Sequence, residues 1–345
     1  MNKRPVMREN RIHACLLPLA GLRIGLRIMW LLLAGCVLFL PTVAQAADAS
    51  PRELLDGGRI DEALRLLTPQ ANGNNAAAFN YLGRAYFALA DWDNAVRFCE
   101  RAAQLDPANA EFQLWLGRSY GEKANSAAAL SAYSLARKTV AAFETAHALD
   151  RKNLPIARDL AEYYATAPSI VGGGSDKALA LAAEIATAHP SDAAWIRAMT
   201  ASHSGDYQGA EREYGESLRI DHNSAAAYLE LARYLRGRKA WDRFQEAVEH
   251  AVQSSRIQPI DRYDAAEVLL KTDRNLPLAA QQMRAYIQSG HTQEAAPLFR
   301  AHFLLGEILL KSGDTAQAAA EYRASLALAS SYRPAADALR RLGHR

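Results

Sequence analysis

The chain has 345 residues, of which 50% are hydrophobic and 22% are charged, and its formal net charge is +3. The positive charge belongs to the N-terminus, because residues 1–46 contain six Lys or Arg and one acid, which leaves the rest of the chain with about −2. A near-neutral chain lacks the broad basic character that drives nucleic-acid binding, so no nucleic-acid partner is expected.

The first 46 residues have the organisation of a secretory signal. A basic stretch precedes the apolar run 29–40, and a segment with small residues follows and ends at Ala46. The apolar run is short for a membrane span, which needs roughly 20 residues. The sequence therefore predicts cleavage after Ala46 and export, most simply to a bacterial periplasm. An alternative remains open, because Leu33 to Cys36 resembles the lipobox of bacterial lipoproteins, and lipidation at Cys36 or an uncleaved signal would anchor the chain to a membrane.

Of the three cysteines, Cys15 and Cys36 lie in this segment, and Cys99 alone remains in the expected mature chain. No internal disulfide can form there. Cys99 stands at an apolar position of a predicted helix, so we expect a buried and inert thiol.

Residues 76–109 carry a regular helix–turn–helix pattern. Small residues stand where two antiparallel helices would cross closely, larger apolar residues share one helix face, and a proline closes the second helix. Acidic residues near Asp91 suit the N-terminal turn of that second helix. The positions of the pattern are Phe79, Leu82, Gly83, Tyr86, Ala95, Cys99 and Pro107.

Similar hairpins follow along the chain, with two interruptions. About ten extra residues within 121–138 separate the next first helix from a second helix expected to begin at Thr139. The segment 167–176 contains Pro and three successive Gly and is predicted to be a loop. We expect a degenerate first unit at 47–75, repeats over 76–331, and a solvated capping helix and tail at 332–345, since a terminal repeat has no neighbour to cover it.

The pattern resembles the tetratricopeptide repeat superfamily, most closely at 76–120 and 295–325. More narrowly, SLARKTVAAFETAHALD (134–150) and AEYYATAPSIVGGGSDKA (161–178) look like a subgroup of exported bacterial repeat proteins with the same interruptions. The resemblance implies an all-α, right-handed superhelix of helical hairpins. It also implies a groove lined by the first helices that binds a peptide or protein, and it implies no reaction.

Nothing in the sequence indicates catalysis, so no catalytic residue and no cofactor are predicted. Gly172 to Lys177 lacks the Gly-Lys-Ser/Thr ending of a phosphate-binding loop. The histidines lack the spacing of a zinc site, and a single cysteine cannot form a cysteine metal site. We therefore expect neither an enzyme nor a metal centre.

Two positions of each first helix, four residues apart, share one face. The resemblance implies that this face lines the groove, and arginine recurs there. Arginine suits bidentate recognition of carboxylates, so these residues could hold an acidic peptide. The competing interpretation is a solvated face whose arginines pair with neighbouring acids. The candidates are Asn80, Arg84, Arg118, Arg158, Arg233 and Arg236.

The two insertions fall in corresponding turns of consecutive repeats, so they should emerge at one edge and touch. Insertions in repeat proteins often map to the binding face. The alternative is loop lengthening that only repacks the edge. The candidates at this edge are Lys123, Tyr133, Pro168, Ile170 and Val171.

Together these features predict a non-catalytic exported scaffold or adaptor. It would bind a protein or peptide partner in the cell envelope through its concave face or its insertion edge. The alternative is an accessory ligand-binding component of an envelope transport system, in which stacked hairpins enclose a small-molecule pore or pocket. The sequence does not fix the oligomeric state.

Overall fold

A computed structural model describes residues 49–343, so the predicted signal at 1–46 and its alternative at Cys36 lie outside the described residues. The described part of the chain contains 17 α-helices and no β-strand, which confirms the expected all-α class. Within it, no helix has the length and apolar character needed to cross a membrane.

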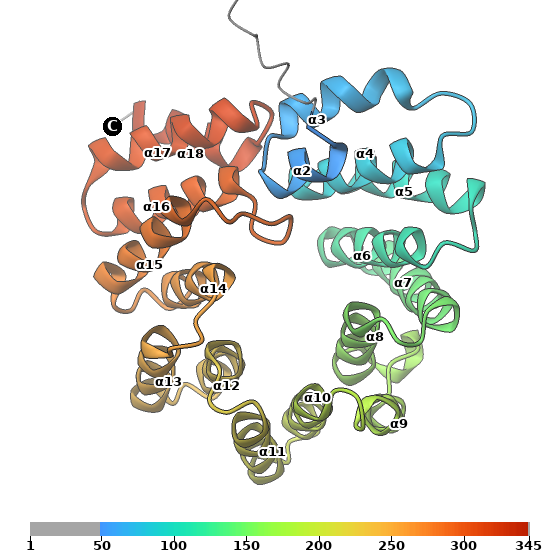
Figure 1. Cartoon of the computed structure of the whole chain (residues 1–345), viewed down its shortest axis with the longest axis vertical. Coiled ribbons are helices and arrows are strands. Elements are labelled where there is room, and N and C mark those ends of the chain that lie inside the picture. The colour runs from blue at the N-terminus through green and yellow to red at the C-terminus, as the bar shows by residue number, and fades with distance from the viewer. Residues whose placement is uncertain (1–48, 344–345) are drawn as a thin grey trace, which may run out of the picture. The chain divides into compact units, whose positions relative to one another are not determined.

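Seven helical hairpins follow one another, and their first helices line the inner side of the arrangement (Figure 1). The hairpins are α4 (Ala76–Ala88) with α5 (Trp92–Leu105), α6 (Ala110–Ser126) with α7 (Ala129–Leu149), α8 (Leu154–Thr166) with α9 (Ser175–Ile185), α10 (Pro190–His203) with α11 (Tyr207–Ile220), α12 (Ala225–Gly237) with α13 (Trp241–Gln253), α14 (Pro259–Leu270) with α15 (Leu276–Ser289), and α16 (Leu298–Lys311) with α17 (Thr315–Leu328). Two short helices, α2 (Pro51–Asp56) and α3 (Ile60–Leu67), and the 3-10 turn η1 (Thr68–Gln70) precede them, and α18 (Arg333–Gly343) follows.

Side-chain caps fix where many of these helices begin. An Asn, Asp or Ser accepts a hydrogen bond from a backbone N–H in the first turn, which satisfies a donor that has no partner inside the helix. Asp91 caps α5 in this way, as the sequence predicted. The others are Ser50, Asn75, Asn109, Asn153, Asp206, Ser224, Asn275 and Asp314.

Glycine at the crossing point lets the two helices of a hairpin approach closely. A Cβ at Gly117 would lie 2.5 Å from the ring of Phe143, and one at Gly306 would lie 2.5 Å from the ring of Tyr322. At Gly83 the obstacle is Cys99, whose Sγ would overlap with the added atom. The expected small-residue crossing is therefore observed in three hairpins.

The first insertion lengthens two helices and does not form a loop. α6 has 17 residues and α7 has 21, whereas α4 has 13. The expectation that the second helix begins at Thr139 is wrong, since α7 begins at Ala129. The segment 129–138 contains no Pro or Gly and several good helix formers, so nothing in it stops the helix.

The second insertion is a loop, as predicted, and it contains the 3-10 turn η2 (Ser169–Val171). Gly172 adopts φ +101°, a conformation that favours glycine, and a Cβ there would lie 2.9 Å from Val140 of α7. The hydroxyl of Tyr163 lies 2.7 Å from the carbonyl of Ala136 and 2.9 Å from that of Val171. The two insertions therefore meet at one edge.

The series of hairpins closes on itself within the compact unit that begins at Ala49 (Figure 1). Leu54, Leu55 and Ile60 of α2 and α3 share a buried apolar cluster with Phe299 of α16 and with Tyr332 and Ala335 at the C-terminal end, a cluster that we call the seam cluster. α18 was expected to be a solvated cap; it packs against α17 and buries Ala335 and Ala338, and Ala335 belongs to the seam cluster, while Arg340 and Arg341 are exposed. The repeat pattern alone does not show that the first unit contacts the last hairpin, because that contact joins residues more than 200 positions apart.

Candidate functional site

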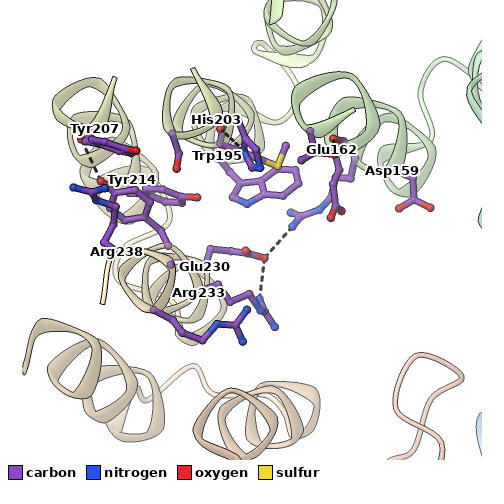
Figure 2. Close-up of a pocket in the computed structure, with 16 residues that line it drawn as sticks. Asp159, Glu162, Trp195, His203, Tyr207, Tyr214, Glu230, Arg233 and Arg238 are labelled. Carbon is purple, nitrogen blue, oxygen red and sulfur yellow. Dashed lines mark hydrogen bonds and ion pairs between the residues drawn. The ribbon is translucent and has the colours of Figure 1, made fainter. Parts of the chain in front are cut away.

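A pocket of about 770 Å³ lies on the inner side, surrounded by the first helices α8, α10 and α12 and part of α11. Figure 2 shows its lining side chains converging from these helices. Three of the arginines proposed from the sequence, Arg158, Arg233 and Arg236, meet there. They lie close together because corresponding positions of successive first helices face the inner side, where this pocket is.

Large apolar and aromatic side chains form the base of this inner pocket. Trp195, Met199, Tyr214 and Tyr234 are each only 7% exposed, so they pack into the core with one surface and bound the pocket with the other. Tyr214 and Tyr234 lie side by side with ring centroids 5.0 Å apart. The base thus offers polarisable surface against which an apolar or aromatic group could stack.

A chain of charges lies above the base. The Glu230 carboxylate accepts from Arg158 at 3.3 Å and pairs with Arg233 at 3.1 Å, so it joins the two guanidinium groups (Figure 2). Arg233 also pairs with Asp264 at 2.7 Å. Arg158 pairs with Asp192 and lies 4.1 Å above the Trp195 ring. Burial alone would lower the pKa of Arg233, but the charges of Glu230 and Asp264 raise it, so this arginine stays charged.

Arg236, Arg238 and Glu162 line the pocket and form no ion pair among the described residues. Arg238 lies 3.4 Å from the centre of the Tyr207 ring. Glu162 is open to the space inside the pocket, yet the surrounding protein raises its pKa, and the charges of Asp159 and Glu230 add to the effect. The pocket therefore presents two cations at one part and a carboxylate with reduced acidity at another.

The remaining groove candidates do not join this pocket. Asn80 is 1% exposed and Arg84 is 4% exposed, so neither can contact a ligand in this conformation. Arg84 pairs with Glu294 and with Glu111. Arg118 pairs with Asp159 at 2.6 Å. For Arg84, Arg118, Arg158 and Arg233 the competing interpretation, pairing with neighbouring acids, describes the observed contacts.

The insertion edge presents apolar surface of its own. Ile170 is 69% exposed and Tyr133 is 41% exposed, and Pro168 is also exposed. Val171 is only 8% exposed because it packs under the loop, so it is unsuited to direct contact. Lys123 is held by Asp93 at 2.8 Å. Of the five candidates at this edge, Tyr133, Pro168 and Ile170 are therefore accessible.

Several pocket residues were missed from the sequence. Tyr214 belongs to a second helix, which the groove pattern does not include, and Arg238 lies at the end of α12 beyond the repeated positions. Arg238 lies two residues after Arg236 and five after Arg233, spacings that do not place it on their helical side, so helical periodicity offered no signal for it. No group of three or more His, Cys, Asp or Glu side chains placed to hold a metal ion occurs among the described residues.

Models of the tetratricopeptide repeat match residues 76–109 and 299–332, which correspond to the hairpins α4–α5 and α16–α17. No curated protein matches the chain in sequence. Among solved structures, yeast Tom70 is 14% identical with a TM-score of 0.47, and the alignment covers 83% of this chain and 58% of that one. A tetratricopeptide repeat protein from Parabacteroides merdae is 16% identical with a TM-score of 0.38, covering 79% and 100%. These likenesses are too distant to bear on function.

Proposed function

We propose, from the premise that this chain belongs to the tetratricopeptide repeat superfamily, that it is an exported, non-catalytic scaffold that binds a protein partner in the cell envelope. The superfamily's general role in protein interaction supports this proposal. The observation that carries it is the inner pocket, in which Arg236 and Arg238 stand without an acidic partner among the described residues, above an aromatic base. Such a surface suits a partner segment with an acidic side chain beside an apolar one.

Site-specific crosslinking in the cell envelope tests this function. A photoreactive residue in place of Arg238 should capture a discrete partner, and the same residue in place of Leu179, which is 42% exposed on the outer helix α9, should not. Arg236→Glu should reduce capture at position 238 by about tenfold, since it places like charge against an acidic segment. Equal capture at both positions, or capture unaffected by Arg236→Glu, would contradict binding at the pocket.

A second candidate is supported by the size of the inner pocket. Small-molecule sites commonly enclose roughly 300–1,000 Å³, and this pocket measures about 770 Å³. The protein would then be an accessory ligand-binding component of an envelope transport system. Native mass spectrometry of the protein isolated from cells should show a retained small molecule that Arg236→Glu releases. A ligand-free mass together with specific partner capture at position 238 would favour the scaffold.

Export is tested separately from binding. The intact mass of the mature protein should correspond to cleavage after Ala46, with a net charge of about −2 for the product. A mass that corresponds to a lipidated N-terminus at Cys36 would place the protein on a membrane surface. Retention of residues 1–46 would contradict cleavage and leave the signal as an anchor.

A further inference from the structure

The junction between the first and last parts of the chain is made by close backbone approach. Gly58, in the turn between α2 and α3, adopts φ +67°, and a Cβ there would lie 2.6 Å from the backbone nitrogen of Leu298. The carboxylate of Asp56 accepts from the backbone N–H of Glu294 at 3.2 Å. The carboxylate of Asp61 accepts from the backbone N–H of Ser330 at 3.0 Å. We call this junction the seam.

A buried arginine reinforces the seam. Arg84 of α4 donates to both oxygens of the Glu294 carboxylate and, at 2.7 Å, to Glu111. Its guanidinium also lies 4.8 Å from the Tyr81 ring and 5.0 Å from the Trp115 ring. The Glu294 side chain is only 13% exposed. A charge held this deeply needs its partner, so Arg84 and Glu294 stay together while the seam is closed.

The seam differs physically from every other junction between neighbouring hairpins of the described chain. The others are joined by a short connecting segment of the chain, so two hairpins cannot move apart without breaking local structure. At the seam the contacting residues are 210 to 269 positions apart in sequence and are held only by non-covalent contacts. The seam can therefore separate without unfolding a hairpin, and water would hydrate both Arg84 and Glu294 once it opened.

We propose that the N-terminal helices α2 and α3, together with Arg84 of α4, act as a clasp that releases from the C-terminal part of the chain at this seam and so admits a protein partner to the inner face. The proposal rests on the proposed scaffold function, because it concerns access to the same inner pocket. Closure covers the seam cluster, in which Phe299 and Ile60 are fully buried and Tyr332 is 6% exposed. The closed form is thus the resting state, and opening is a minor population that a partner selects.

A reversible lock tests the clasp directly. Asp61→Cys combined with Ser330→Cys places two thiols on opposite sides of the seam, at residues whose carboxylate and backbone N–H meet at 3.0 Å, and loss of free thiol on oxidation measures how much of the protein is bridged. Cys99 is fully buried and will not compete. Oxidation should lower envelope-partner capture at position 238 by about tenfold, and a reductant should restore it, if access needs an opening of the seam. Undiminished capture by the oxidised protein would overturn the clasp.

The matched control is a disulfide within one hairpin. Ser191 and Ser217 place their hydroxyl oxygens 3.0 Å apart between α10 and α11, which are already joined by a turn. Ser191→Cys combined with Ser217→Cys should form its bridge equally well and leave capture unchanged. Loss of capture in this control as well would assign the effect to general stiffening and would also overturn the clasp.

A second measurement needs no partner. Hydrogen exchange of the Glu294 and Ser330 amides reports the seam, since both donate across it. Arg84→Gln should accelerate exchange at these amides by about tenfold, while Arg118→Gln should leave both unchanged. The disulfide variant lacks the Asp61 acceptor of the amide at 330, so its oxidation should slow exchange at the Glu294 amide, which still donates to Asp56. Exchange that is unaltered by Arg84→Gln would overturn the clasp even if the scaffold binds its partner. Absence of capture in every form, with the exchange result as expected, would instead remove the scaffold function.

Discussion

Arg84 in the first full hairpin is bound to Glu294 in the loop before the last hairpin, with Nε 2.9 Å from one carboxylate oxygen. Burial alone would lower the pKa of Arg84, but the hydrogen bonds and charge of Glu294, together with the charge of Glu111, raise it. The residue that the sequence placed in the groove as a ligand contact is therefore part of the closure of the chain.

Replacing Arg84 by Ala should lower the free energy of unfolding by about 3 kcal/mol, because it leaves the Glu294 carboxylate buried without a partner. Arg118→Ala is the matched control, since the Arg118 and Asp159 side chains are 28% and 24% exposed. It should cost only about 1 kcal/mol. Urea unfolding of both variants measures the difference, and equal losses would contradict a special role for Arg84.

Gly58→Ala should destabilise the fold more than Gly290→Ala. Both glycines have φ +67°, so alanine suffers the same left-handed penalty of about 1 kcal/mol at each. Only Gly58 also meets backbone, with Leu298 N 2.6 Å from the added Cβ, whereas Gly290 has open space. At Gly58 this close approach should add about 1–3 kcal/mol to the loss of unfolding free energy. Thermal unfolding of the two variants tests this. Identical unfolding midpoints would show that the backbone near Leu298 shifts to accept the added Cβ at little cost.

Gly117→Ala should destabilise the second hairpin, and Phe143→Leu should partly rescue it. The atoms nearest to a Cβ at Gly117 all belong to the Phe143 ring, so replacing that ring makes room. Gly83→Ala should resist rescue by Cys99→Ala, since the backbone nitrogen of Cys99 would still lie 3.1 Å away. Each clash should cost about 1–3 kcal/mol in urea unfolding. Full rescue at both sites would contradict the difference between side-chain and backbone obstruction.

Cys99 should resist alkylation in the folded protein. Burial raises the pKa of its thiol from 9.0 to about 12. Three pKa units reduce the thiolate about 10³-fold near pH 8, and burial also blocks the reagent. Because the folded pKa is raised, its contribution to stability is complete below pH 9 and is lost as pH rises toward 12. Iodoacetamide labelling with and without urea measures the reactivity. Rapid labelling of the native protein would be inconsistent with a packed thiol.

Glu162→Gln should increase the free energy of unfolding, relative to the unmodified protein, by more near pH 7 than at pH 4. The pKa of Glu162 is raised by the loss of water around it inside the pocket and by the charges of Asp159 and Glu230. Its favourable contribution to stability therefore holds below the ordinary pKa of 4.5 and is lost as pH rises through the folded pKa. Glu216→Gln is the opposite-sign control, because a hydrogen bond from Arg219 lowers the pKa of Glu216 and its contribution is lost as pH falls. Urea midpoints at the two pH values should move in opposite directions, and parallel shifts would refute the assignment.

The hairpins were predictable because their signals are local. Gly83, Gly117 and Gly306 mark helix crossings, and capping residues such as Asp91 mark helix starts, so a window of one repeat contains the information. The helical extension at 129–138 was misjudged because the repeat register was carried past a segment whose own composition favours a helix. The groove candidates Arg158 and Arg233 line the pocket, since helical spacing fixes the side of the helix on which a residue stands, and their role in binding stays a prediction.

By itself, the sequence determined the helical hairpins and their order, because each depends on contacts within a few dozen residues. The inner placement of the first helices was implied by the resemblance to the repeat superfamily. Only the tertiary structure decided what those inner side chains do. Glu294 lies in a connecting loop with no periodic pattern, and its pairing with Arg84 depends on the accumulated rotation of all the hairpins between them. The rotation per hairpin is small and is set by packing, so its sum, which brings the two ends together, cannot be read from any single repeat.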